Sequence, residues 1–249
     1  MQKKTQFTYL IIGRGRMASH MASYLDGLGI PYLHWWRGCG ENLLEFAKLC
    51  RRRLLLISDD AIEGFLQENP ELLDRPCIHF SGALVLPGVY GVHPMQSFTH
   101  ELYSVEKYRK ITFVMEKRDR SFADLLPGLP NIHAVIEPEK KSLYHAACVL
   151  GGNFTVLLWQ KMLSLLADCG ISEEAALPYI QEVQNNVYRD PKAALTGPLT
   201  RGDERTIKQN LDALTGDAFK EVYEACVQAY EKEQRENHEC TKDLESQAG

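Results

Sequence analysis

The chain has 249 residues, of which 45% are hydrophobic and 24% charged, and its formal net charge is −5. This length allows one or two domains, and the composition is that of an ordinary globular protein. No basic stripe indicates a nucleic-acid partner, and the apolar run at residues 9–12 is too short for a signal peptide. No run approaches the roughly 20 apolar residues that span a bilayer. We therefore expect a cytoplasmic protein without a nucleic-acid or membrane partner.

The seven cysteines are spread along the chain without a C-x-x-C pair. Cysteines in a reducing compartment are usually free, and this spacing matches no common metal site. We expect free, mostly buried thiols and no bound metal.

The N-terminal half alternates short apolar runs with helical periodicity. Residues 7–12 (FTYLII) form a β-rich run that ends on glycine, and Met17, Met21 and Leu25 then fall on one helical face that Gly29 ends. Further strands are predicted at 32–36, 54–57, 77–80, 90–93, 111–115 and 132–136, and helices at 42–49 and 61–69. This alternation predicts βαβ units, and hence an α/β protein with a Rossmann parallel sheet.

The pattern becomes helical after Pro138, which suits the first turn of a helix. Helices are predicted at 138–167, 172–188, 203–214 and 217–232, with no strand-like run among them. We therefore predict an NAD(P)-binding Rossmann domain at 1–137 and an all-helical domain, for substrate binding or dimerisation, at 138–249. The polar tail beyond residue 232 is expected to fray.

A glycine-rich turn follows the first predicted strand. Its residues match the G-x-G-x-x-G/A fingerprint of dinucleotide-binding proteins: Gly13, Arg14, Gly15, Arg16, Met17 and Ala18. The first glycine allows the tight turn, the second lets backbone N–H groups approach a pyrophosphate, and the small third residue packs the helix on the strand. A strand–helix turn that merely needs glycine is the alternative. The position between strand and helix favours a bound dinucleotide.

The end of the second predicted strand bears on the choice between NAD and NADP. An NAD-selective site usually places an acid there to bind the ribose 2′-hydroxyl. This strand ends in Trp-Trp-Arg37, and no acid follows until Glu41. Arg37 suits a 2′-phosphate and the adenine ring, although it also fits a solvated loop. We expect NADP rather than NAD, and we include Ser58, after the third strand, among the cofactor-binding residues.

Four motifs in the chain resemble a known family. They are Ser81-Gly-Ala, Gly-Val-His-Pro-Met-Gln-Ser-Phe at 91–98, Tyr-His-Ala-Ala-Cys-Val-Leu-Gly-Gly-Asn at 144–153 and Ala-Leu-Thr-Gly-Pro-Leu-Thr-Arg-Gly-Asp at 194–203. The chain is similar, over residues 9–230, to Rossmann-like proteins that carry the helical domain of unknown function 2520. These are related to 6-phosphogluconate and 3-hydroxyisobutyrate dehydrogenases, to pyrroline-5-carboxylate reductases and to deazaflavin-dependent NADP reductases. The resemblance implies the fold and a dinucleotide site, but no substrate.

His93 is the first candidate for proton transfer. It follows a strand-like run, and ligands of open α/β sheets bind beyond the carboxyl ends of strands. An imidazole can take or give an alcohol proton at neutral pH. The His-Pro-Met string resembles prephenate dehydrogenases, where the histidine acts at the substrate hydroxyl and an upstream serine matches Ser81. Alternatively, His93 orders the loop before Pro94.

His145 and Asn153 are placed on the first helix of the second domain. Eight residues of helix separate them by about 80° and ~12 Å along the axis. Gly151 and Gly152 interrupt the helix between them, which indicates a close approach by a ligand or another backbone. Related hydroxyacid dehydrogenases carry a lysine where this chain has Val149, so the proton-transfer role would pass to His145 or His93. A helix-packing histidine and asparagine remain the alternative.

Thr196 and Arg201 lie in a loop before Asp203, a natural N-cap. The guanidinium of Arg201 suits an anionic substrate, with Thr196 beside it, or it ties the loop to a carboxylate of its own chain.

These observations favour an NADP-dependent oxidoreductase acting on a small, anionic hydroxy/oxo or imine compound. A prephenate-dehydrogenase-like oxidative decarboxylation and a non-catalytic NADP-binding sensor or scaffold are the alternatives. We expect His93, His145 and Asn153 to converge on one pocket with Arg201 at its rim, which requires the two histidines to lie within about 12 Å of each other. The helix at 138–167 is apolar on nearly all sides between residues 146 and 159, so we also expect a homodimer.

Overall fold

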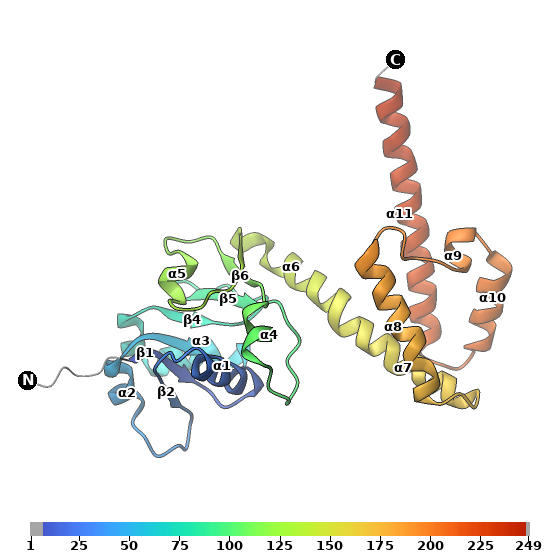
Figure 1. Ribbon diagram of the computed structural model, residues 1–249. Coiled ribbons are helices and arrows are strands. Elements are labelled where there is room, and N and C mark those ends of the chain that lie inside the picture. Colours follow the sequence, from blue (N-terminus) through green and yellow to red (C-terminus); the bar gives the residue numbers. More distant parts are fainter. Residues whose placement is uncertain (1–6, 248–249) are drawn as a thin grey trace, which may run out of the picture. The chain divides into compact units, whose positions relative to one another are not determined.

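The structure is a computed structural model that describes the backbone of residues 7–247 and the side chains of residues 7–239. It comprises two compact units, Met1–Thr155 and Val156–Gly249, which are described separately below (Figure 1).

The first unit is built on a seven-stranded sheet with the strand order β2-β1-β3-β4-β5-β6-β7. The strands are β1 (Phe7–Ile12), β2 (Tyr32–Trp35), β3 (Cys50–Leu55), β4 (Cys77–His79), β5 (Tyr90–Pro94), β6 (Phe113–Glu116) and β7 (His133–Ile136). The first five run parallel, β6 pairs antiparallel with β5, and β7 is parallel to β6. The predicted α/β class is therefore confirmed, and each predicted strand has a counterpart.

Strand β1 is apolar on both faces because helices cover the sheet on both sides. Successive side chains of a strand point to opposite faces. Tyr9 and Ile11 accordingly join the hydrophobic cluster under α1 (Arg16–Gly27), which also includes residues of α4 (Val105–Arg109) and α5 (Phe122–Leu125). Leu10 and Ile12 join the cluster formed with α2 (Leu43–Leu49) and α3 (Asp59–Glu68).

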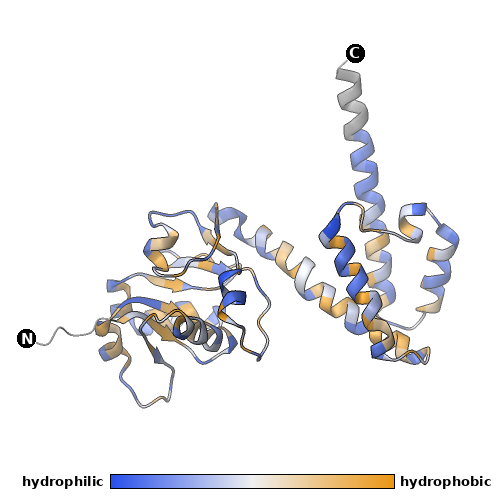
Figure 2. Ribbon diagram, viewed as in Figure 1, coloured by the Kyte–Doolittle hydropathy of each residue, from blue (hydrophilic) through white to orange (hydrophobic). Residues whose placement is uncertain are grey.

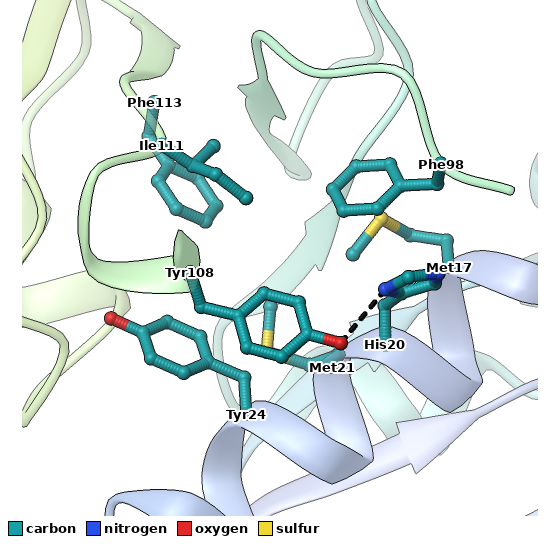
Figure 3. Close-up of a pocket in the computed structure, with 8 residues that line it drawn as sticks. All are labelled: Met17, His20, Met21, Tyr24, Phe98, Tyr108, Ile111 and Phe113. Atoms are coloured by element: carbon teal, nitrogen blue, oxygen red, sulfur yellow. Dashed lines mark hydrogen bonds between the residues drawn. The ribbon is translucent and has the colours of Figure 1, made fainter. Parts of the chain in front are cut away.

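A small cavity lies beside α1, between that helix and the segment after β5 (Figure 3). Its volume is about 10 Å³, which is room for about one water molecule and not for a ligand. His20 spans it, with Nδ1 2.8 Å from the hydroxyl of Tyr108 and Nε2 3.0 Å from the carbonyl of Thr99. Arg16 also donates to the carbonyl of Phe98. These contacts hold the segment that follows His93 against α1.

A continuous helical segment leads out of the first unit. It consists of a 3₁₀ turn (Pro138–Lys140), α6 (Lys141–Cys148), a π-helical turn (Val149–Phe154) and α7 (Thr155–Asp168). The π-helical turn contains the two glycines that predicted an interruption. The compact units divide after Thr155 rather than at the predicted residue 137, because α6 packs on the sheet and buries Lys141.

The sequence predicts no stretch able to span a bilayer. The structure corrects this expectation. The helical segment Pro138–Asp168 is long enough and apolar enough to cross a membrane, judged by its length and composition alone. Its mean hydropathy reaches 1.2 over the most apolar window, none of which is buried within the chain. A helix of this kind is weak evidence for a membrane.

The second unit consists of helices. Its elements are α7, α8 (Glu173–Arg189), α9 (Pro198–Arg201), α10 (Glu204–Ala213) and α11 (Phe219–Gln247). Asp203 caps α10, as predicted, by accepting a hydrogen bond from the backbone N–H of Thr206. Helix α11 continues to Gln247, where the sequence predicted fraying after residue 232. Side-chain pairs one turn apart, such as Lys232 and Glu236, favour the helix there.

Cysteines with described side chains are free, but most are not buried. Cys50 and Cys77 are buried in the first unit, whereas Cys169 and Cys226 are exposed and Cys39 and Cys148 are half-buried. The expectation of mostly buried thiols is therefore wrong for these positions, because Cys169, in the turn after α7, and Cys226, on α11, belong to the second unit, which buries few side chains. Cys240 lies outside the described side chains.

Candidate functional site

The strand order identifies the edge of the sheet at which a ligand is expected. The chain moves from β1 to β2 on one side and then to β3 on the other, so the order reverses at β1. In open parallel sheets, ligands bind beyond the carboxyl ends of the strands at such a reversal. The glycine turn follows β1, Ser58 follows β3, Ser81 follows β4, and His93 lies near the end of β5. Most predicted site residues of the first unit therefore lie at this carboxyl edge.

Gly13 begins the turn in a conformation that requires glycine. Its φ is +129°, and a Cβ there would collide with the backbone carbonyl of Leu56 at the end of β3. The N–H of Gly13 donates to the carbonyl of Trp35 at 2.9 Å, and its carbonyl lies 2.7 Å from Nε2 of His34. The turn is thus fixed by β2 and β3, and sequence reasoning missed the part that His34 plays.

The start of α1 is open to an anion. Gly15 is the N-cap of this helix, no side chain caps it, and no atom lies within 4 Å of the place where a Cβ would stand. Arg14 and Arg16 are exposed on either side, whereas Ala18 is buried, as the fingerprint requires. The first N–H groups of a helix lack partners within it and carry partial positive charge. The turn therefore fits the pyrophosphate of a dinucleotide.

Arg37 lies just beyond β2 and is largely solvent-exposed. Its side chain is 86% exposed and forms an ion pair with Glu68 at 3.8 Å. A surface pair of this kind contributes at most about 1 kcal/mol, so it leaves the guanidinium available to a ligand. Ser58 is exposed at the N-cap of α3, and its hydroxyl makes no capping bond.

His93 and His145 lie together, as the shared-pocket hypothesis requires. Their ring centroids are 5.8 Å apart, well within the limit of about 12 Å that the hypothesis set. Nδ1 of His93 lies 2.7 Å from the hydroxyl of Tyr144, with which it shares a hydrogen bond. Sequence reasoning missed Tyr144 as a site residue, although it begins the motif that contains His145. The three side chains bring two imidazoles and a phenol to the end of β5.

The surroundings keep His93 neutral. Burial, and then the neighbouring His145 and Lys141, lower the pKa of His93 to about 4, against a weaker opposite effect of Asp59. Burial and a hydrogen bond with Cys148 raise the pKa of Tyr144 above its usual value. At neutral pH the pair therefore consists of an uncharged imidazole and a protonated phenol. Such a pair can pass a proton to a bound substrate without holding a net charge.

Ser81 anchors the loop that faces His145. Its hydroxyl donates to the carboxylate of Asp59 at 2.5 Å and accepts from the backbone N–H of Leu84 at 2.9 Å. The next residue, Gly82, lies against the imidazole of His145, because a Cβ there would stand 2.7 Å from Nδ1. That Nδ1 is buried and has no hydrogen-bond partner among the described residues. Ser81 thus holds the loop against which His145 packs, and its partner Asp59 was not predicted.

A buried ionic network lies behind the histidines. Lys141, at the start of α6, donates to Glu116 at the end of β6 at 2.6 Å and also to the carbonyl of Leu84. Arg118 donates to the other carboxylate oxygen of Glu116 at 2.8 Å. Lys141 and Glu116 are both almost fully buried, and burial lowers the pKa of Lys141. The network fixes α6, and with it Tyr144 and His145, to the sheet.

The roles of all the predicted site residues stay predictions, and three of these residues lie away from the histidines or in the second unit. Asn153 is exposed on the π-helical turn. Thr196 and Arg201 are exposed in the second unit, and their place near the histidines of the first unit stays a prediction.

The sheet order and the glycine turn define a Rossmann-type α/β protein. Residues 112–230, which run from β6 into α11, match the family model described as domain of unknown function (DUF2520). This match confirms the resemblance found in the sequence motifs. A comparison with curated proteins returned no match.

Solved structures share the fold over nearly the whole chain. The protein described as "putative NADP oxidoreductase BF3122" from Bacteroides fragilis is 22% identical with a TM-score of 0.73, covering 92% of this chain and 100% of its own. The reductive aminase from Aspergillus terreus in complex with NADPH and ethyl levulinate is 13% identical with a TM-score of 0.63, covering 93% and 95%. Plasmodium falciparum pyrroline carboxylate reductase with NADP bound is 15% identical with a TM-score of 0.55, covering 90% and 99%. At these identities the likeness establishes the fold.

Proposed function

We propose that the protein is an NADP-dependent oxidoreductase acting on a small hydroxy, oxo or imine compound. The main observation in support of this proposal is that the glycine turn and the His93–Tyr144 pair lie at the same edge of one sheet. The similar structures that are described with NADPH or NADP support the choice of cofactor. A catalytic centre needs both a place for the dinucleotide and a proton source, and this edge offers both.

The chain holds the cofactor through backbone groups and one exposed arginine. The N–H groups at the start of α1 would bind the pyrophosphate, because Gly15 leaves them open. Arg37 would pair with the 2′-phosphate, for which a guanidinium fork is suited, and no acid at the end of β2 repels it.

The pair of His93 and Tyr144 would supply the proton. A bound nicotinamide dinucleotide supplies or accepts the hydride. The chain must then deliver or take one proton at the substrate oxygen or nitrogen, and either the Tyr144 hydroxyl or the His93 imidazole can do so. His145, which lies against Gly82, would face the substrate beside this pair and also lowers the pKa of His93.

A binding and turnover assay tests this function. Fluorescence titration of NADPH and NADH should show tighter binding of NADPH, and a panel of ketoacids, aldehydes and imines should include one that oxidises NADPH. Gly15→Asp should abolish binding because it places a carboxylate where the pyrophosphate lies, in open space that leaves the fold intact. No binding of either cofactor would reject the proposal. Tight NADPH binding without turnover would favour a sensor or scaffold.

The anionic character of the substrate is a finer proposal that rests on Arg201. Arg201→Ala should raise KM for a carboxylate substrate by about 10-fold or more, with a smaller effect on an uncharged analogue. Equal effects on both substrates would contradict a carboxylate partner.

We further propose a cytoplasmic homodimer that covers the apolar helix α7. Val156, Leu157 and Leu158 are each between 42% and 49% exposed in the single chain, and Figure 2 shows hydrophobic residues along α7. Exposed apolar surface of this kind is usually covered by a partner. Light scattering in detergent-free buffer should return a dimer. A monomer of 28.3 kDa, or recovery only with membranes, would contradict this proposal.

A further inference from the structure

Arginines gather at the edge of the sheet opposite the glycine turn. Arg51, Arg52 and Arg53 are the second to fourth residues of β3. Arg75 precedes β4, and Arg120 follows β6, which runs antiparallel to β5. The starts of β3 and β4 and the end of β6 meet at this amino edge of the sheet. Three segments that are far apart in sequence therefore bring arginines to one place.

A cavity of about 490 Å³ opens at this edge. Its lining consists of four arginines, one aspartate and one proline: Arg51, Arg52, Arg75, Arg120, Asp74 and Pro76. The lining thus carries four positive charges against one negative, in a chain whose net charge is −5. Small-molecule sites typically measure roughly 300–1,000 Å³, so the cavity has room for a ligand of nucleotide size.

The aspartate in the lining is already engaged by another cation. The guanidinium of Arg53, which is buried beneath the cavity lining, donates to Asp74 at 2.8 Å. Arg75 lies 3.8 Å from the other oxygen of the same carboxylate. Asp74 therefore does little to neutralise the remaining arginines of the lining.

The lining arginines also act on one another. Arg52 is partly buried and donates through Nε to the carbonyl of Asp124 at 2.6 Å. Burial lowers the pKa of Arg52, Tyr9 and Asp124 act against this, and the nearby Arg120 and Arg51 lower it further. Arginines that line one cavity repel one another, and a multiply charged anion between them would reduce that repulsion.

We propose that this cavity binds a small molecule carrying a diphosphate or a longer phosphate chain, as a second anion site separate from the glycine turn. Guanidinium forks bind phosphate oxygens in pairs, and four of them exceed what one phosphate can satisfy. A nucleic acid would require a basic stripe that follows its backbone, whereas these arginines line a single cavity of a chain with net negative charge.

Calorimetric titration of pyrophosphate into the full-length protein tests the site. In the double variant Arg75→Ala/Arg120→Ala, pyrophosphate should bind about 10-fold more weakly or worse, because two charge-assisted contacts are lost. Both side chains are exposed in the absence of ligand, so the core is unchanged. Lysine at both positions should restore part of the affinity. Arg205→Ala, which removes an exposed arginine from α10, is the matched control and should bind like the wild type.

Gly15→Asp separates this site from the cofactor turn. Pyrophosphate binding that survives Gly15→Asp and falls in the arginine double variant supports the proposal, whether or not NADPH binds. Unchanged affinity in the double variant, or complete loss in Gly15→Asp alone, would overturn it. Tighter binding of citrate or of a single-stranded oligonucleotide than of pyrophosphate would overturn the phosphate-bearing small molecule as ligand.

A second measurement needs no substitution. Pyrophosphate should protect Arg75 and Arg120 of the wild type from modification by phenylglyoxal, as measured by peptide mass spectrometry, and should leave Arg205 reactive. Equal modification with and without pyrophosphate would contradict the site even if the double variant failed to fold.

Discussion

At the carboxyl edge of the sheet a glycine turn exposes backbone N–H groups, whereas at the amino edge four arginine side chains surround a cavity. The first arrangement depends on the absence of side chains, because a Cβ at Gly13 would strike the carbonyl of Leu56. The second depends entirely on side chains. The first is therefore contiguous in sequence and visible as a motif, while the second is assembled from separate segments and is visible only after folding.

The largest expected effect concerns the proton source at the carboxyl edge. His93→Gln and Tyr144→Phe should each lower turnover of NADPH by ~10²–10⁴ while leaving NADPH affinity unchanged, because each removes a partner of the proton-donating pair. The double variant Arg75→Ala/Arg120→Ala should turn over like the wild type. A large loss of turnover in the arginine variant would show that the amino edge also contributes to the reaction, against the proposed separation of the two sites. Full activity in both single variants would remove the pair from the mechanism.

A smaller effect is expected for Arg37, the side chain proposed to select NADPH over NADH. Arg37→Ala should weaken NADPH binding by about 1.5–3 kcal/mol and leave NADH binding nearly unchanged, because only NADPH carries the 2′-phosphate. Parallel fluorescence titrations measure the difference. Glu68→Gln is the matched control, since it frees Arg37 from its surface partner and should not weaken NADPH binding. Equal affinities for both cofactors in the unsubstituted protein would refute the selectivity.

Stability in acid should depend on the burial of His79 and His93. Burial, then Lys141 and Arg118, lower the pKa of His79 to about 3, and the pKa of His93 is lowered to about 4. Between these values and the usual 6.5, the unfolded chain binds protons that the folded chain does not, so the free energy of unfolding falls as pH falls through this window. At pH 5 the loss is about 2 kcal/mol for each histidine.

His79→Asn tests this account. Asparagine keeps an acceptor for the backbone N–H of Ser81, which His79 Nδ1 now provides at 3.3 Å, but it does not titrate. Urea unfolding from pH 7 to 4.5 should therefore show a shallower decline for the variant. An identical decline would mean that His79 does not contribute.

A further effect on stability is expected at Gly82. In Gly82→Ala the new methyl group would meet the ring of His145, which must move by a few tenths of an ångström or more. We expect about 1–3 kcal/mol less stability and a shifted pH profile of turnover. Gly64→Ala is the matched control, because open space surrounds that helical glycine. Unchanged turnover and stability in Gly82→Ala would show that His145 tolerates displacement.

The strands, the glycine turn and the approach of His93 to His145 could all be predicted from the sequence. Each of these depends on neighbours in the chain or on the family motifs. Tyr144 was missed as a partner of His93, although the adjacent His145 was expected there, because nothing in the local pattern distinguishes a proton-donating tyrosine from one that only packs on the sheet. The ion pair of Lys141 with Glu116 was missed for the same reason, since a lysine and a glutamate in sequence usually indicate solvent exposure. The boundary was expected at residue 137 because strand-like runs give way to helical periodicity there. This change does not indicate that α6 packs on the sheet.

The ion pair of Lys141 with Glu116 also determines where the chain can be cut without a loss of stability. Lys141 lies inside the first unit, and Glu116 would lose its closest buried cation in a fragment that ended at residue 137. Breaking a buried ion pair by removing one member typically costs about 3–5 kcal/mol, which is a large share of the stability of a small domain. A fragment that ends at Thr155 keeps the pair. The minimal folding unit of this protein is therefore longer than its Rossmann sheet, and the helix that leaves the sheet is part of what makes the sheet stable.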